Sequence, residues 1–199
     1  YKRVDHAWLI RNADTQEAFD KIAKLPLVPA VAAPNGEGMQ DSTPIMELIE
    51  QRYPEPATHP EDAALRFVSE LLEEFADEWG NKWMFHYRWD ADVDQTIVSR
   101  RLVTEMLGPG ADSEQIEQMA GMVKSRMSGR GFAIGSNDKT APLIARSFSE
   151  GLALLEKHLA AMAAAGHGYL LGSRPAFADF GLAAQLYQAL IDPTAGALM

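Results

Sequence analysis

The chain has 199 residues, of which 47% are hydrophobic and 23% charged, values typical of a globular protein that buries a sizeable core. The formal net charge of -10 repels phosphate backbones and anionic lipid, so we expect neither nucleic-acid nor membrane partners. The sequence contains no cysteine, which excludes disulfides, thiolate metal sites and a cysteine nucleophile within it and agrees with a cytoplasmic location.

The first 24 residues predict one strand and one helix. Residues 4–11 form a short apolar run that favours a strand, although Asp5 and His6 interrupt it. Residues 15–24 carry Ala18, Phe19, Ile22 and Ala23 at helical spacing, which predicts an amphipathic helix.

A hairpin and a second helix are predicted next. The apolar run at 27–33 is followed by Asn35-Gly36, a pair typical of two-residue hairpin turns because both positions need positive φ. Residues 39–40 would form the return strand. Asp41-Ser42-Thr43-Pro44 then has the capping side chain and early proline that favour the start of a helix, which ends at Tyr53-Pro54.

The rest of the chain has a helical pattern. Three prolines between residues 54 and 60 indicate an interdomain linker at 55–60, between domains at 1–54 and 61–199. Apolar residues then recur at helical spacing, and no strand is expected after residue 61. The expected helices run along residues 64–83, 97–106, 112–127, 148–162 and 175–190.

Residues 27–49 form a corner suited to an extended peptide. If the Val28-Pro29 bond is cis, the turn leaves the Val28 amide and carbonyl unpaired, so that a peptide could pair with them as an added strand. Ser42 at the helix N-terminus offers a hydroxyl and backbone amides to a carboxylate. Asp41 beside it can accept from an ammonium, and this combination suits the α-amino-acid end of a ligand.

Val28-Pro29, the Asn-Gly turn and Asp41-Ser42 together resemble the glutathione site of cytosolic glutathione transferases. The resemblance implies that the Val28-Pro29 backbone pairs with the cysteinyl residue of glutathione. Asp41 and Ser42, with help from Gln40, would hold the γ-glutamyl end. It also implies an α+β fold, with a partial thioredoxin-like domain before an all-helical domain, and a homodimer. No metal-ligand spacing is present, so no metal is expected.

A second motif, at residues 168–180, is similar to the family segment that caps a buried helix, with Asp179 as the capping acid. The Ser or Thr expected three residues earlier is Ala176, and losing a cap hydroxyl costs about 1 kcal/mol, so we expect a weaker helix start. Leu27 stands where many members carry Lys or Gln for the glycine carboxylate of glutathione. Lys21, Lys24 and Arg11 are alternatives for that contact.

The family's activating Ser, Tyr or Cys follows its first strand, and this sequence begins at what resembles the second strand. We therefore expect a longer product with the catalytic residue outside these residues. Because the first strand lies between the second and third in this family, we also expect a gap in the sheet with unpaired amides.

The expected function is a transferase that binds glutathione and conjugates it to, or uses it to reduce, a small apolar electrophile. The alternatives are a non-catalytic binding or interaction protein of the same fold and, less favoured, a reductase or isomerase. In isolation, Asp41-Ser42 would more often be only a helix cap. Trp83 and Tyr87 either pack in the core, which we favour, or line the electrophile pocket.

Overall fold

The computed structural model describes residues 5–9 and 14–199. The chain divides into two compact units, and each is described by itself. Unit 1 comprises residues 1–57 with 104–111, and unit 2 comprises residues 58–103 with 112–199.

Unit 1 contains an antiparallel sheet of three strands in the order β1 (Ala7–Leu9), β2 (Ala30–Ala32) and β3 (Gly38–Gln40). The other residues of the strand predicted at 4–11 lie outside the described part, apart from Asp5 and His6. The expected gap is absent from the described sheet, because β1 pairs directly with β2, with Leu9 opposite Ala30.

The hairpin between β2 and β3 is confirmed, but its turn differs from the two-residue type expected. The Gly36 N–H donates to the Ala33 carbonyl at 2.9 Å, and the Ala33 N–H donates to the Glu37 carbonyl at 2.7 Å. Within the pair only Gly36 has a positive φ, of 83°. Pro34 therefore occupies the second position of a four-residue turn, and the left-handed glycine follows it.

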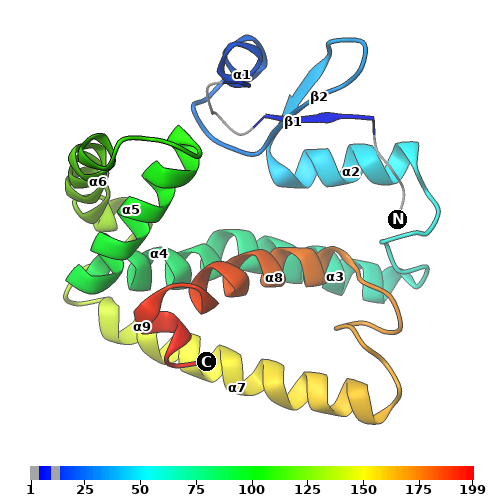
Figure 1. Cartoon of the computed structure of the whole chain (residues 1–199). Coiled ribbons are helices and arrows are strands. Elements are labelled where there is room, and N and C mark those ends of the chain that lie inside the picture. Colours follow the sequence, from blue (N-terminus) through cyan, green and yellow to red (C-terminus); the bar gives the residue numbers. More distant parts are fainter. Residues whose placement is uncertain (1–4, 10–13) are drawn as a thin grey trace. The chain divides into compact units, whose positions relative to one another are not determined.

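Helices α1 (Gln16–Ile22) and α2 (Ser42–Arg52) lie on opposite sides of this sheet (Figure 1). Phe19 of α1 forms the core of the unit with Leu9 and Ala30. A Cβ on Gly38 would lie 2.1 Å from Cγ2 of Ile22, so the absence of a side chain at this position lets α1 approach the sheet.

Unit 2 is helical, as predicted, and residues 61–199, all of them described, contain no strand, only an isolated bridge between Tyr169 and Gly172. The first predicted helix is interrupted by a π-helical turn, and the glycine-rich loop after residue 129 contains a short 3-10 helix. In the described chain no helix combines the length and apolar character of a membrane span. The elements are α3 (Ala63–Phe75), η1 (Ala76–Gly80), α4 (Asn81–Asp90), α5 (Asp92–Leu107), α6 (Ser113–Ser128), η2 (Gly131–Ile134), α7 (Ala141–Ala164), α8 (Phe177–Leu190) and α9 (Pro193–Gly196).

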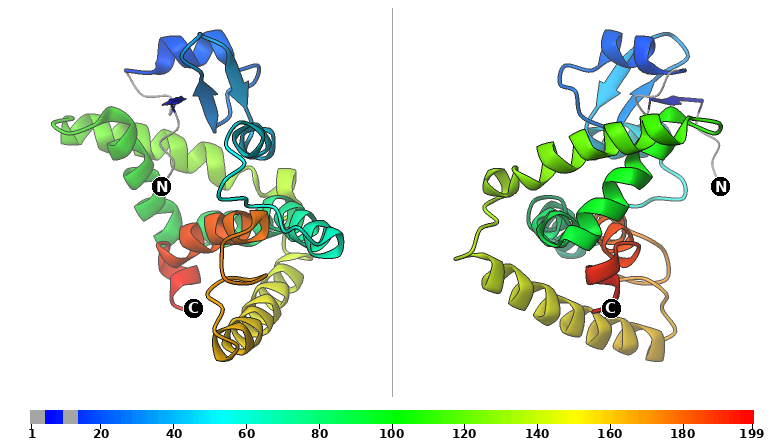
Figure 2. Two further views of the ribbon diagram at one scale, coloured as in Figure 1. Left: turned by 90° about the vertical axis from the view of Figure 1, so that its right-hand side faces the viewer. Right: turned by 60° about the vertical axis from the view of Figure 1, so that its left-hand side comes forward.

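Helix α8 runs beside α3, and both are seen from further sides in Figure 2. A Cβ on Gly181 of α8 would lie 3.1 Å from the Cα of Glu73 in α3, so the two helices are closely packed there. At the start of α8 the Asp179 carboxylate accepts from the Ala176 N–H at 2.8 Å and from the Leu170 N–H at 2.9 Å. The predicted role of Asp179 as the capping acid is confirmed.

The weaker start expected for α8 is compensated from another helix. Ala176 has no hydroxyl to offer, but the Ser69 Oγ of α3 accepts a hydrogen bond from the Ala178 N–H at 3.2 Å. Ser69 and Ala178 are both fully buried. A side chain 109 residues away in the sequence thus satisfies one of the free amides of the α8 N-terminus.

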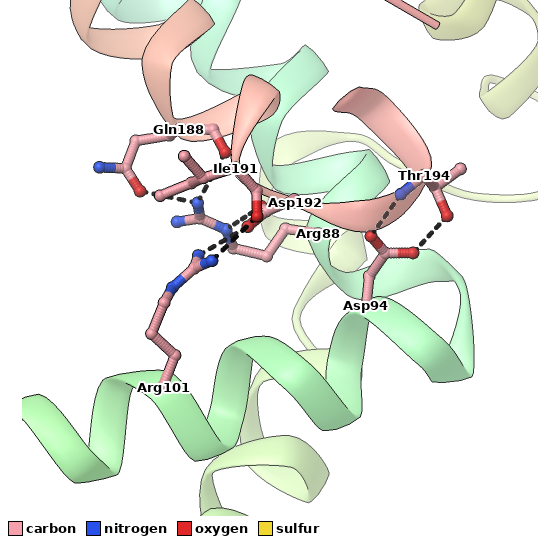
Figure 3. A network of polar contacts seen from close by, with 7 residues as sticks. All are labelled: Arg88, Asp94, Arg101, Gln188, Ile191, Asp192 and Thr194. Carbon is pink, nitrogen blue, oxygen red and sulfur yellow. Dashed lines mark hydrogen bonds and ion pairs between the residues drawn. The ribbon is translucent and has the colours of Figure 1, made fainter. Parts of the chain in front are cut away.

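A network of buried polar side chains fixes the C-terminal turn α9 (Figure 3). Asp192 accepts from the Arg88 Nε and from an Arg101 Nη, each at 2.6 Å, and it is only 2% exposed. Asp94, also buried, accepts from the backbone N–H of Thr194 at 2.8 Å and from its hydroxyl. Because a buried carboxylate is stable only when paired and hydrogen-bonded, this network depends on every member.

Candidate functional site

The first part of the candidate site is the segment that enters β2. The Val28-Pro29 bond is cis, as the sequence predicts. Val28 is 58% exposed, and neither its N–H nor its C=O makes a hydrogen bond with any described residue. Unpaired backbone groups beside a strand are what an extended peptide needs to add to a sheet. Val28 therefore provides a place for such a peptide.

The second part is the N-terminus of α2, which a backbone hydrogen bond joins to the first. The Asp41 N–H donates to the Pro29 carbonyl at 3.0 Å, directly beyond the last pair of the hairpin, Ala30 with Gln40. This bond places the start of α2 next to the segment that contains Val28.

Asp41 has an unusual backbone conformation for its residue type. Its φ of 88° and ψ of 137° make it the one non-glycine residue with positive φ in the described chain. Such a conformation costs of order 1–3 kcal/mol and is found mostly at functional sites. The Asp41 side chain makes no capping hydrogen bond, although Asp41 occupies the N-cap position. The interpretation of Asp41 as a plain helix cap therefore has no support from its side chain.

Ser42 is the first residue of α2 and is partly buried. Its hydroxyl and its N–H have no hydrogen-bond partner among the described residues. The first turn of α2 contains no acidic residue. The free hydroxyl and N–H of Ser42, with the positive end of the helix dipole, together favour a bound carboxylate.

Gln40 is placed differently from the other predicted contact residues. Its carboxamide Oε1 accepts from the N–H groups of Lys24 and Leu25, and its Nε2 donates to the carbonyls of Leu25 and Leu27. A carboxamide has two donor hydrogens and two acceptor lone pairs, so these four bonds use its whole capacity. Gln40 holds the loop before Val28, and its side chain has no polar group left for a ligand.

The structure narrows the choice among the basic residues that the sequence analysis named for a ligand carboxylate near Val28. Leu27 is 60% exposed and brings an apolar surface to this position. Lys21 forms an ion pair with Glu17 at 2.6 Å, and this hydrogen bond, with the charge of Lys21, lowers the pKa of the Glu17 carboxyl. Arg11 lies outside the described residues. Lys24 is exposed and is the remaining alternative among those named from the sequence.

Trp83 and Tyr87, named as alternative pocket residues, lie in the hydrophobic core of unit 2. They are 5% and 9% exposed and pack with Phe148 and Ile144. The Trp83 indole N–H donates to the Ser147 hydroxyl at 3.0 Å, and burial raises the pKa of the Tyr87 hydroxyl. This placement agrees with the packing interpretation.

Comparison with known protein families gives a match for the segment that contains these residues. Residues 1–57 match the family model described as the N-terminal domain of glutathione S-transferase. This segment contains Val28, Pro29 and the consecutive residues 40–42. None of the curated proteins compared with the chain matches it.

Proposed function

From the match of residues 1–57, which supports membership of the glutathione S-transferase superfamily, we propose that this chain is an enzyme that binds glutathione in unit 1. The bound thiol would attack a small apolar electrophile, conjugating or reducing it. The observation that carries the proposal is the adjacency of the unpaired Val28 backbone and the unpaired Ser42 hydroxyl, joined through the bond from Asp41 to Pro29.

In the proposed binding mode, the cysteinyl backbone of glutathione pairs with the N–H and C=O of Val28. The α-carboxylate of the γ-glutamyl residue accepts from the hydroxyl and N–H of Ser42, and the α-ammonium donates to Asp41. Charge-assisted bonds of this kind are among the stronger hydrogen bonds in proteins. The positive φ of Asp41 supports the assignment. The conformation is strained, yet the Asp41 side chain makes no capping hydrogen bond, and strain of this kind is common at ligand sites.

The proposed chemistry needs the thiolate, since the thiol itself is a weak nucleophile. A donor that stabilises the sulfur anion would lower the thiol pKa, and the thiol proton would pass to solvent. In conjugation by substitution the thiolate then forms a C–S bond to the electrophile, and the bond to the leaving group breaks, so that the leaving group, a halide for example, departs with its electron pair. We assign no residue to the donor role, and we propose Lys24 for the glycine carboxylate of glutathione, since it is exposed and next to the loop.

We also propose that the protein is a cytoplasmic homodimer. Helix α3 supports this, because it exposes a row of apolar side chains at helical spacing that a second copy could cover. Their exposed fractions lie between 37% and 54%: Leu65, Val68, Leu71 and Phe75.

Calorimetric titration with glutathione tests the proposal, with Ser42→Ala as the site variant. Loss of one charge-assisted bond of about 1.5–3 kcal/mol predicts a dissociation constant at least about tenfold higher. Ser113→Ala is the matched control, because Asp112-Ser113 is the same dipeptide at the start of α6. It should leave the affinity unchanged. Equal affinity for wild type and Ser42→Ala would remove Ser42 from the site.

A turnover assay with an aryl halide separates the two candidate functions. Glutathione conjugation supports the enzyme, whereas tight glutathione binding without conjugation of any electrophile in a broad panel supports the non-catalytic alternative.

A further inference from the structure

The loop between α1 and β2 buries little side-chain surface. Leu25, Leu27 and Val28 are each between 58% and 60% exposed, so their side chains contribute little burial. Within the loop the Leu27 N–H donates to the Leu25 carbonyl at 2.8 Å, and the N–H and C=O of Val28 make no hydrogen bond with any described residue. An exposed segment that buries so little side-chain surface gains order from each hydrogen bond that fixes its backbone.

Gln40 supplies this restraint. Its Oε1 lies 3.1 Å from the Lys24 nitrogen and 3.3 Å from the Leu25 nitrogen. Its Nε2 lies 2.7 Å from the Leu25 oxygen and 2.6 Å from the Leu27 oxygen. The Leu27 carbonyl belongs to the peptide unit whose N–H is that of Val28. Gln40 therefore controls the position of the group that would pair with a peptide ligand.

Gln40 is itself firmly anchored. It is the last residue of β3 and pairs with Ala30 of β2. The following residue, Asp41, bonds to Pro29 through its N–H. The main chain of Gln40 thus connects the hairpin to the start of α2, while its side chain connects the hairpin to the loop.

We propose that Gln40 is a positioning residue that pre-organises the Val28 backbone for glutathione and does not itself contact the ligand. This inference rests on the proposed function. A loop already held in its bound geometry does not lose that freedom on binding, which is the general gain from pre-organisation. The role is specific to the cysteinyl half of the ligand, because the γ-glutamyl half is assigned to Asp41 and Ser42.

The test compares two ligands on the full chain, in wild type and Gln40→Ala. Glutathione engages both halves of the site. γ-Glutamylmethylamide keeps the α-carboxylate and α-ammonium but has no cysteinyl residue, so it engages only the α2 end. Gln51→Ala is the matched control, since it makes the same chemical change at an exposed glutamine of α2.

We expect Gln40→Ala to weaken glutathione binding about tenfold, equivalent to about 1.4 kcal/mol, and to leave γ-glutamylmethylamide binding unchanged. Amide hydrogen exchange should accelerate at Lys24 and Leu25, the two N–H groups bonded to Oε1, and not in α2. Gln51→Ala should change none of these measurements.

Each other outcome contradicts a definite statement. Wild-type binding of glutathione with unchanged affinity in Gln40→Ala overturns the positioning role and leaves the proposed function intact. An equal loss for both ligands overturns the specific link to Val28, because it indicates a general disturbance of unit 1. If the wild-type protein does not bind glutathione, both the proposed function and this inference are overturned. If amide hydrogen exchange at Lys24 and Leu25 is unchanged in Gln40→Ala, Gln40 does not restrain the loop, whatever the ligand results.

Discussion

Replacing Ser69 by alanine should destabilise unit 2 by removing the acceptor that serves the start of α8. The Ala178 N–H lies at the second position of the helix, where no carbonyl of the same helix can reach it. Ala178 is fully buried, so water cannot replace the lost Ser69 hydroxyl. A buried backbone N–H without a partner is the expected result.

The size of the effect follows from the geometry. An unsatisfied buried donor costs about 1–3 kcal/mol, and the 3.2 Å distance places this bond toward the weaker end. We therefore expect a loss of about 1–2 kcal/mol in the free energy of unfolding. Urea titration followed by tryptophan fluorescence measures it, because Trp79, Trp83 and Trp89 all belong to unit 2.

The decisive measurement is a rescue by Ala176→Ser. Ala176 has the extended conformation of an N-cap residue, with φ of -115° and ψ of 175°, so a serine hydroxyl there can reach the amides of the first turn. Ala176→Ser should recover about 1 kcal/mol in the Ser69→Ala background and change little in wild type. Ser99→Ala is the control, because the buried Ser99 hydroxyl only donates to the Thr96 carbonyl. Ala176→Ser is therefore combined with wild type, Ser69→Ala and Ser99→Ala. An equal change in the free energy of unfolding in all three would refute the reasoning.

Three further predictions concern packing and assembly. Asp192→Asn should cost about 3–5 kcal/mol in urea unfolding, since it leaves Arg88 buried without its counter-charge, whereas Asp138→Asn on the surface should cost less than about 0.5 kcal/mol. Gly38→Ala should cost about 1–3 kcal/mol in thermal unfolding, because its Cβ would lie 2.1 Å from Cγ2 of Ile22. Gly121→Ala is the control: its Cβ would have no neighbour within 4 Å, so it should stabilise α6 by up to about 1 kcal/mol. Leu71→Glu on the exposed face of α3 should shift the proposed dimer to monomer in analytical ultracentrifugation; a monomeric wild type, or a dimeric variant, would contradict the proposed interface.

Features that depend on residues close together in the sequence could be predicted, whereas contacts between distant residues could not. The helices of unit 2 follow from apolar periodicity, and the capping role of Asp179 follows from its place three residues after Ala176. The Ser69 contact could not be predicted this way, because its two partners are 109 residues apart and serine is common in helices. The carboxamide contacts of Gln40 were missed for a similar reason. A glutamine beside a ligand motif suggests a ligand contact unless the course of the neighbouring loop is known.

Asp-Ser occurs at the start of two helices in this chain, and the two pairs differ in a way that only the structure reveals. Asp112 has an ordinary φ of -65°, and its carboxylate accepts from the Gln115 N–H at 3.0 Å, so it is a structural cap. Asp41 has a φ of 88° and makes no such bond. The same dipeptide thus caps one helix, whereas at the other Asp41 adopts a costly conformation and the two side chains make no capping hydrogen bond. The difference originates in the hydrogen bond from Asp41 to Pro29, which ties the second pair to the hairpin. Because strain of this kind reduces stability, its position beside the open Val28 backbone supports the proposal that one ligand contacts both.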